Sequence, residues 1–187
     1  MSAPLVYGAI TSLDGFVNDA DGRFEWAAPD EEVHAFVNDL ERPTGTYWYG
    51  RRMWDTMRVW GHDAAWIDES PVTQDYASIW RSADKVVFSR TLARLEAPRT
   101  RLETGFDPAT AAAWKREADE PIGVGSATLA AAALTAGLVD ELWSITVPVV
   151  VGAGTRWLPH GVALGLELTG HRRFAAGAVW SRYRVRR

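Results

Sequence analysis

Short apolar runs alternate with longer stretches of helical spacing as far as Gly154. Residues 5–10 form an apolar run between turn-forming residues, which is typical of a strand buried on both faces of a parallel sheet. Over residues 30–40 the apolar positions recur on one helix face, and acidic residues occupy the first turn. Pro43 then ends the helix. The chain is therefore expected to begin with a strand followed by a helix.

The same alternation of strand and helix continues from residue 46. Further strands are predicted at residues 46–49, 85–88, 121–124 and 141–147. Further helices are predicted at residues 50–57, 72–80, 109–117 and 126–136. Residues 59–71 and 96–108 lack either pattern and are predicted as loops.

Beyond Gly154 the pattern changes to two strand-like runs. Residues 164–174 and 178–185 are joined by Ala175, Ala176 and Gly177, which predicts a hairpin. The expected fold is therefore α/β, with a mostly parallel sheet ended by an antiparallel hairpin. No internal repeat or low-complexity linker interrupts the chain, so a single domain over residues 1–187 is expected.

Composition narrows the chemistry that the chain can perform. Of its 187 residues, 47% are hydrophobic and 24% are charged, as in an ordinary globular protein with a sizeable core. The absence of cysteine excludes disulfides, thiolate metal sites and cysteine nucleophiles. The four histidines never fall four residues apart, so no helical metal motif is visible and no metal is expected.

Charge and hydropathy argue against membrane or nucleic-acid partners. The N-terminus lacks a signal peptide pattern, and the longest apolar stretch, residues 142–151, is much shorter than the roughly 20 residues of a membrane span. We therefore expect a cytoplasmic protein. Six arginines and no acid lie in the last 17 residues, but they alternate with Tyr183 and Val185 as on one solvated strand face. No basic stripe elsewhere would track phosphates, so nucleic acid is not expected.

Three turns from strand to helix carry residues suited to anions. Ligands in parallel sheets gather where strands end and helix N-termini offer free N–H groups. The first turn contains Gly50, Arg51 and Arg52, and the second contains Ser89 and Arg90, which suit a phosphate monoester such as the 2'-phosphate of NADP. Each turn alone also fits an ordinary helix cap with solvated arginines.

The third turn has the sequence Gly123-Val124-Gly125-Ser126-Ala127-Thr128-Leu129. It could cradle a pyrophosphate, because a glycine-rich strand end leads directly into a helix. It is not a Rossmann fingerprint, since Thr128 replaces the last glycine, and it contains no P-loop lysine. The specific signal is the occurrence of all three turns in sequence order.

These turns occur together with three other motifs. They are Ser12-Leu13-Asp14-Gly15, Gly137-Leu138-Val139-Asp140-Glu141-Leu142 and the stretch from Pro148 to Gly154. In this order they resemble the dihydrofolate reductase-like superfamily, and within it the C-terminal reductase half of the bifunctional deaminase-reductase of riboflavin biosynthesis. The resemblance covers residues 6–183 and implies a three-layer α/β/α fold. The deaminase half is absent, since its zinc motif requires cysteines that this chain lacks.

The resemblance implies that NADPH lies across the strand ends. It assigns Gly50, Arg51 and Arg52 to the phosphates, and Ser89 and Arg90 to the 2'-phosphate. It assigns Val124, Gly125, Ser126, Ala127, Thr128 and Leu129 to the pyrophosphate, and Ala9, Phe16 and Val17 to the nicotinamide. It also raises the hypothesis of a cis peptide between Gly125 and Ser126, because relatives have Gly-Gly there. Met53 departs from the family pattern, in which classical dihydrofolate reductases carry threonine.

Candidate catalytic and substrate residues are fewer. Glu31 matches the carboxylate that anchors the pterin in dihydrofolate reductase, since it follows Trp26-Ala27-Ala28-Pro29. Asp14 is the other candidate acid, because riboflavin reductases use the same turn beside the substrate. An ordinary helix N-terminal charge explains Glu31 equally simply. His62 and Asp63 share one predicted loop and are a further pair considered for proton relay.

Aromatic and basic residues supply the remaining candidates for substrate binding. Trp26 and Trp60 are retained as stacking partners for a flat heterocycle, although core and interface packing explains most of the ten tryptophans. Arg156, with Arg58, is considered for a substrate phosphate.

The leading functional hypothesis is an NADPH-dependent reductase of the riboflavin type. Its substrate would be 5-amino-6-(5-phosphoribosylamino)uracil or a related small heterocycle. One alternative is a dihydrofolate or pteridine reductase, which requires a buried carboxylate at Glu31. An alternative of another class is a nucleotide-binding module without turnover. The resemblance also implies a homodimer, with residues 142–147 and the C-terminal hairpin as the interface.

Overall fold

A computed structural model describes residues 3–62, 65–67 and 70–186. Over these residues the chain forms an eight-stranded sheet with the order β5-β4-β3-β6-β1-β7-β10-β9. The strands of this sheet are β1 (Leu5–Thr11), β3 (Thr46–Gly50), β4 (Asp84–Phe88), β5 (Thr100–Glu103), β6 (Ile122–Val124), β7 (Glu141–Thr146), β9 (Leu166–Arg173) and β10 (Val179–Val185). The six strands from β5 to β7 are parallel, and β10 pairs antiparallel with both β7 and β9. The predicted α/β fold with a C-terminal hairpin is confirmed.

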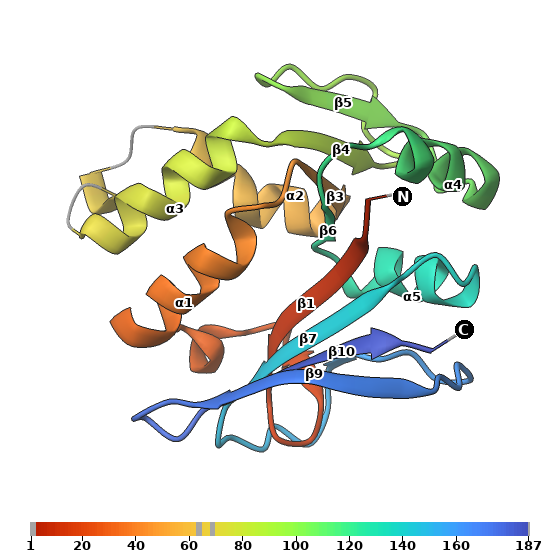
Figure 1. Ribbon diagram of the computed structural model, residues 1–187. Coiled ribbons are helices and arrows are strands. Elements are labelled where there is room, and N and C mark those ends of the chain that lie inside the picture. Colours follow the sequence, from red (N-terminus) through yellow and green to blue (C-terminus); the bar gives the residue numbers. More distant parts are fainter. Residues whose placement is uncertain (1–2, 63–64, 68–69, 187) are drawn as a thin grey trace.

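Helices cover both faces of the sheet (Figure 1). They are α1 (Glu31–Glu41), α2 (Arg51–Met57), α3 (Pro71–Ser82), α4 (Pro108–Glu117) and α5 (Ala127–Thr135), with short 3-10 turns η1 (Glu25–Ala27), η2 (Arg58–Gly61) and η3 (Ala65–Ile67). Helices α1, α2 and α3 pack on one face, and α4 and α5 pack on the other. Within the described residues no helix is long and apolar enough to cross a membrane.

Three short strands lie in segments that were predicted as loops or left unassigned. Strand β5 pairs in parallel with β4 at the edge of the sheet, inside the expected loop of residues 96–108. Its sequence Thr-Arg-Leu-Glu has one apolar position, so it gave no hydrophobic signal. Strands β2 (Phe16–Asn18) and β8 (Thr155–Arg156) form a separate antiparallel pair that is too short for a period-2 pattern to be visible.

An ion pair and a hydrogen bond join α4, the residue before β7 and the start of β1. Lys115 of α4, almost fully buried, places its Nζ 2.5 Å from Oδ2 of Asp140. The same carboxylate oxygen accepts a hydrogen bond from the backbone N–H of Leu5 at 2.8 Å. Glu141, the next residue, pairs with Arg182 of β10. The Asp140-Glu141 dipeptide therefore has a structural role at the start of β7.

A glycine in the central strand β1 makes room for a tryptophan ring of β7. Gly8 of β1 is paired with Trp143 of β7, and the indole ring lies over the glycine. A Cβ atom at Gly8 would lie 1.9 Å from Cε2 of Trp143. The ring can occupy this place only because residue 8 has no side chain.

We predict that Gly8→Ala destabilises the protein, because the added methyl group forces the Trp143 ring out of its site. The expected loss is about 1–3 kcal/mol of the free energy of unfolding, measured by denaturant or thermal unfolding. Gly105→Ala is the matched control, since a Cβ atom there has no neighbour within 4 Å. Equal stability of the two variants would contradict this account of the packing.

Candidate functional site

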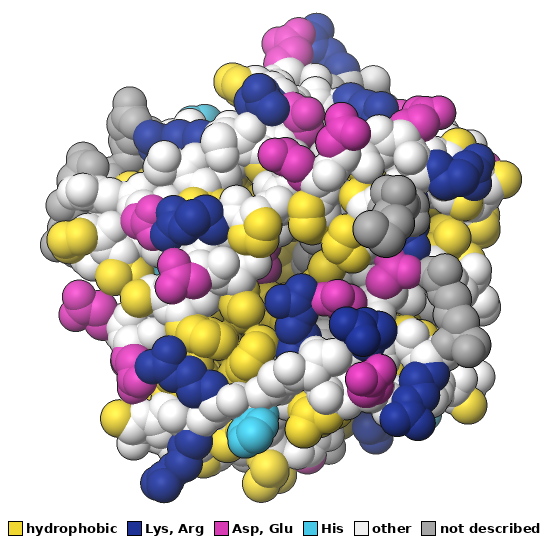
Figure 2. Space-filling view, viewed as in Figure 1, with side chains coloured by type: hydrophobic (Ala, Val, Ile, Leu, Met, Phe, Trp, Pro, Cys, Tyr) yellow, Lys and Arg dark blue, Asp and Glu magenta, His cyan; other side chains and the backbone are white. Residues whose placement is uncertain are grey.

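An open cleft of about 1380 Å³ lies on the sheet face that carries α1, α2 and α3. Figure 2 shows a hollow near the middle of the molecule in this view, with hydrophobic side chains on its walls. One wall is α1, and the other is formed by α2, η2 and Tyr76 of α3. Residues 17–22, 24 and 25, which follow β1, line its mouth together with Gly154 and Thr155. The cleft follows the central strands from their carboxyl ends at Ala9 to the level of Pro121.

The floor of the cleft consists of glycines covered by aromatic rings. Gly123 of β6 and Gly125, just after β6, each leave room for a tyrosine ring of β3, and a Cβ atom at Gly125 would lie 2.3 Å from Cε1 of Tyr49. The rings of Tyr47 and Tyr49 are stacked, with centroids 5.5 Å apart and planes 6° apart. Such a floor is flat and apolar, which suits a planar ring system.

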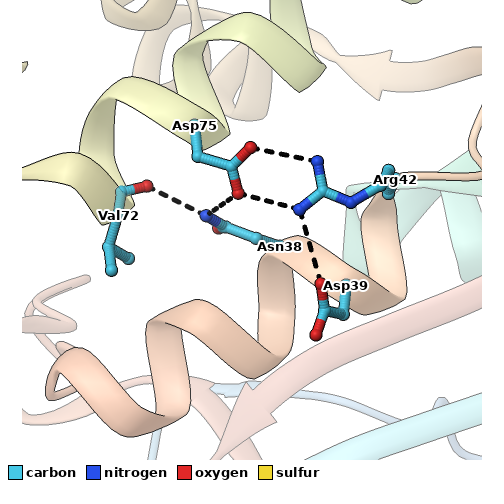
Figure 3. A network of polar contacts seen from close by, with 5 residues as sticks. All are labelled: Asn38, Asp39, Arg42, Val72 and Asp75. Carbon is cyan, nitrogen blue, oxygen red and sulfur yellow. Dashed lines mark hydrogen bonds and ion pairs between the residues drawn. The ribbon is translucent and has the colours of Figure 1, made fainter.

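A polar network fixes the two walls relative to each other (Figure 3). Arg42 of α1 donates hydrogen bonds to both carboxylate oxygens of Asp75 in α3, at 3.0 and 2.9 Å. The buried amide of Asn38 donates to Oδ2 of Asp75 at 2.8 Å and to the carbonyl oxygen of Val72 at 2.9 Å. The hydrogen bonds from Arg42 hold the pKa of Asp75 below its ordinary value, so the carboxylate stays charged.

The α-helices differ in how their first amides are capped. Side chains of Asp30, Ser70 and Asp107 accept hydrogen bonds from first-turn amides of α1, α3 and α4. Gly50 and Ser126, at the same positions of α2 and α5, provide no side-chain cap. Both uncapped helices begin at the cleft, where residues of their first turns line it. The cleft therefore receives two helix N-termini whose amides are available to an anion.

Comparison with known proteins identifies the family. The model of the RibD C-terminal domain matches residues 4–180. The chain belongs to the RibD C-terminal domain family. Among curated proteins, the uncharacterized protein YyaP of Bacillus subtilis (strain 168) is 24% identical over 178 residues, which are 94% of this chain and 91% of that protein.

Solved structures agree on the fold. A putative riboflavin biosynthesis protein from Shewanella sp. PV-4 has a TM-score of 0.76 at 17% identity, with 100% of both chains covered. A dihydrofolate reductase from Enterococcus faecalis, complexed with NADP(H) and RAB-propyl, has a TM-score of 0.68 at 10% identity, with 99% of both chains covered. The resemblance to the dihydrofolate reductase-like superfamily is thereby confirmed at the level of the fold.

The structure brings part of the expected cofactor site of this RibD C-terminal domain together. Of the residues expected to bind the cofactor, those that line the cleft are Ala9, Val17, Arg52, Val124, Gly125 and Ala127. Gly50 and Ser126 lie beside them, since a Cβ atom at Gly50 would be 2.8 Å from the Ser126 Oγ. Thus the turns after β3 and β6, distant in sequence, meet at the carboxyl ends of adjacent strands.

The remaining residues of the expected cofactor site lie outside the cleft lining. Phe16 and Leu129 are buried, Thr128 is exposed, and Arg51 is paired with Asp55 at 2.8 Å. Leu129 belongs to the core beneath α5, so its side chain serves packing.

The second anion-suited turn lies beyond the cleft, after β4. The Ser89 hydroxyl accepts hydrogen bonds from the backbone N–H groups of Thr91 and Leu92, at 3.2 and 3.1 Å. Arg90 is exposed beside it, with no ion-pair partner among the described residues. The 2'-phosphate role of Ser89 and Arg90 stays a prediction.

The predicted cis peptide between Gly125 and Ser126 is wrong, because the described residues contain no cis peptide bond. Ser126 has extended backbone angles, φ −136° and ψ 126°, and leads directly into α5 with a trans bond. Met53, which departs from the family pattern, lines the cleft, and its Cγ would lie 3.3 Å from a Cβ atom at Gly125. An apolar side chain thus occupies the place of the expected hydroxyl.

The substrate-side candidates are divided between the cleft and its surroundings. Trp60 lines the cleft and packs edge-on against Tyr76, with ring centroids 4.7 Å apart. Trp26 is outside the lining, where its Nε1 donates to the carbonyl oxygen of Arg23 at 3.2 Å. Arg156 is also outside it, with its guanidinium 5.0 Å from the centre of the Phe16 ring.

Neither candidate acid faces the cleft. Asp14 accepts hydrogen bonds from the N–H groups of Gly152 and Val151, at 2.7 and 3.2 Å, and so holds the loop after β7. Hydrogen bonding, first of all with Ser12, lowers the pKa of Asp14. Glu31 is exposed at the start of α1, so the buried carboxylate that the pteridine alternative requires is not found at this position. Their catalytic roles stay predictions without geometric support.

The proposed proton-relay pair and a metal site find no support in the described residues. His62 is exposed, and Asp63 lies outside the described residues. No cluster of three or more His, Asp or Glu that could hold a metal ion occurs in the part of the chain that the structure describes.

Sequence reasoning missed the one glutamate in the helical wall of the cleft. Glu41 is at the C-terminal end of α1, on the helix face that also carries His34 and Val37, and all three line the cleft. Burial raises the pKa of Glu41 to about 7, and the hydroxyl groups of Tyr47 and Thr44 partly oppose this increase. Burial also lowers the pKa of His34, against the raising effect of Asp75. The only sequence signal was the spacing i, i+3, i+7 from His34, which places Glu41 on the inward face.

We predict that Glu41→Gln changes how stability depends on pH. The pKa of Glu41 is about 7 in the folded state against an ordinary value of 4.5, so ionisation opposes folding as pH rises through this window. The variant and the wild type should be equally stable below pH 4.5. Above pH 7 the variant should be more stable by up to about 3 kcal/mol. Denaturant unfolding across this range measures the difference, and a difference that does not change with pH would contradict the assignment.

Proposed function

We propose that this protein is an NADPH-dependent reductase that transfers a hydride to a small heterocyclic substrate lying in the cleft. The observation that carries the proposal is the pair of uncapped helix N-termini, α2 and α5, at a glycine-floored cleft beside Arg52. This arrangement suits a dinucleotide, because exposed amides and a guanidinium bind phosphates while a flat apolar floor accepts planar rings. Membership of the RibD C-terminal domain family supports it.

The residues present fit such a cofactor. Arg52 and the amides at the start of α5, beside Gly125 and Ala127, would hold the pyrophosphate. Ala9 and Val17, small apolar residues at the cleft mouth, would contact the nicotinamide. The dihydrofolate reductase of similar fold is complexed with NADP(H), which supports a nicotinamide cofactor. When bound, the dihydronicotinamide supplies the hydride.

The protein contributes position and a dry environment to this reaction. Hydride transfer needs the donor and acceptor carbons face to face, which the flat floor between two fixed walls favours. The Arg42–Asp75 ion pair and Asn38 keep α1 and α3 in place, so the cleft width is set before a ligand enters. Apolar lining, including Met53 and Trp60, excludes water from the reacting faces.

The substrate is proposed from the family as a small heterocycle of the riboflavin precursor type, with 5-amino-6-(5-phosphoribosylamino)uracil as the first compound to test. A pteridine is disfavoured because Glu31 is exposed. The alternative of a nucleotide-binding module without turnover predicts that the protein binds NADPH but that no candidate substrate causes NADPH to be oxidised.

We also propose a cytoplasmic homodimer, with β7, β9 and β10 forming the interface.

Titration with NADPH tests the cofactor site, because Trp60 and Trp143 line the cleft and their emission reports its occupancy. We expect saturable quenching. Arg52→Ala should weaken binding about tenfold, since it removes a charge-assisted hydrogen bond. The matched control is Arg116→Ala, an exposed arginine on α4 on the other face of the sheet. Absence of NADPH binding would overturn the proposed function, and equal affinities of the two variants would remove Arg52 from the site.

Arg90 provides a separate test of cofactor preference. Arg90→Ala should weaken NADPH binding about tenfold and leave NADH binding unchanged, because only NADPH carries the 2'-phosphate. Arg94→Ala is the control, since Arg94 is exposed in the same loop and is paired with Glu96. Equal loss of affinity for both nucleotides would contradict a role of Arg90 at the 2'-phosphate.

A further inference from the structure

The proposed reduction needs a proton donor inside the cleft. Hydride addition to a C=O or C=N bond leaves an electron pair on the oxygen or nitrogen, which then takes a proton. Asp14 holds a loop and Glu31 is exposed, so neither faces the cleft. A donor that faces the reacting atoms must therefore come from elsewhere in the lining. The carboxylates at the mouth are exposed or accept hydrogen bonds from backbone amides; they are Asp19, Asp21 and Glu25.

The α1 wall brings one imidazole into the cleft. Of the four histidines, His34 alone is among the lining residues that the structure describes. Its half-buried ring lies 5.7 Å from the Tyr76 ring and 6.0 Å from the Trp60 ring, centroid to centroid. No hydrogen bond of the imidazole is found among the described residues, and neither ring nitrogen is a fully buried atom without a partner. The ring is thus held by two aromatic neighbours while its N–H edge stays open to a ligand.

Helix α1 places His34 near the mouth of the cleft. The helix lies between β1 and β3 in the chain, and both strands run parallel to β6, so α1 runs back from the carboxyl ends of the strands. His34 is in its first turn, and Glu41 is seven residues later, roughly 10 Å further along the helix. Ala9 and Val17, the residues proposed to contact the nicotinamide, are at the mouth. His34 is therefore closer than Glu41 to the level of the reacting ring.

A carboxylate of α3 acts on the imidazole by its charge. His34, Asn38 and Arg42 follow one another at i, i+4 and i+8 on α1, and the last two donate hydrogen bonds to Asp75. Burial lowers the pKa of His34, and the negative charge of Asp75 partly opposes this decrease. Tyr76, the other titratable group of α3 at this ring, stays neutral because burial raises its pKa. An imidazolium in these surroundings releases its proton more easily than one in water, and Asp75 stabilises it until then.

We propose that His34 is the general acid of the reduction and that its imidazolium N–H protonates the oxygen or nitrogen of the bond that accepts the hydride. The assignment rests on the proposed function, which places the nicotinamide at the mouth. As a C–H bond forms with the hydride, the electron pair of the C=O or C=N bond moves to the heteroatom, and this atom takes the proton as the imidazolium N–H bond breaks. The imidazole is left neutral and is protonated again by water, while NADPH has become NADP⁺.

The first test needs no turnover. It follows the imidazole Cε1–H signals of the four histidines by NMR in the full-length protein while the pH is varied, and His34→Gln identifies the His34 signal. We expect its titration midpoint to lie below the ordinary value of 6.5. The midpoint should be lower with bound NADP⁺ than with bound NADPH, because only the oxidised ring carries a positive charge. His160, exposed and outside the described lining, is the internal control and should titrate equally in both complexes.

The second test measures NADPH oxidation with 5-amino-6-(5-phosphoribosylamino)uracil as the substrate. Above the midpoint of His34, kcat/KM of the wild type should fall about tenfold for each pH unit, because only the imidazolium donates a proton. His34→Gln should lower kcat at least about 100-fold, abolish this pH dependence and leave NADPH affinity unchanged. His160→Gln, the matched control, should behave like the wild type.

The contrary results separate the role of His34 from the proposed function. Equal His34 midpoints with NADP⁺ and NADPH would place the imidazole away from the nicotinamide and overturn the assignment. A His34→Gln variant that keeps the wild-type pH dependence, or that binds NADPH much more weakly, would also overturn it. A wild type that binds NADPH without oxidising it leaves the decision to the NMR midpoints. Failure of the proposed function appears instead as absence of NADPH binding to the wild type.

Discussion

The structure depends on the absence of side chains along two central strands. Gly8 of β1, Gly123 of β6 and Gly125, just after β6, have no side chains, so aromatic rings from the neighbouring strands lie over the middle of one sheet face. If these positions carried larger side chains, those side chains would fill the space between the sheet and the helices packed on it. Here α1 and α3 are held by the polar network of Asn38, Arg42 and Asp75. The cleft therefore depends on glycine in the central strands, and its width depends on the polar contacts between α1 and α3.

Helix capping connects this space to its proposed use. Helices α1, α3 and α4 satisfy their first amides with their own side chains. Helices α2 and α5 do not, and they are the ones that begin at the cleft. Uncapped amides cost stability, typically about 1 kcal/mol for each missing cap, so an external acceptor is the natural partner for them. The same two turns are among the three that the sequence predicts to suit anions, because the glycine at each strand end allows close approach.

Elements with strong local patterns were predictable from the sequence. The strand over residues 5–10 and the helix ending before Pro43 match β1 and α1 closely, since apolar spacing alone defines them. Strand β5 was not predictable, because its pairing with β4 supplies the order that its Thr-Arg-Leu-Glu sequence lacks. Likewise, no local pattern relates Asn38 to Asp75, which are 37 residues apart. The strands and helices could be predicted from the periodicity of apolar residues, whereas these tertiary contacts join residues that are distant in sequence and are visible only in the structure.

The same distinction explains the candidate acids. Asp14 and Glu31 were chosen because their motifs resemble those of relatives, but Asp14 serves to hold a loop and Glu31 is exposed. Glu41 had no motif, because its surroundings come from β3 and from the segment before β6, which only the folded chain brings together. Motifs thus located the end of the cleft where the two uncapped helices begin, because the glycines and polar residues of those turns are local in sequence. The other end is lined by residues of α1, β3 and the segment before β6, so no local motif marks it.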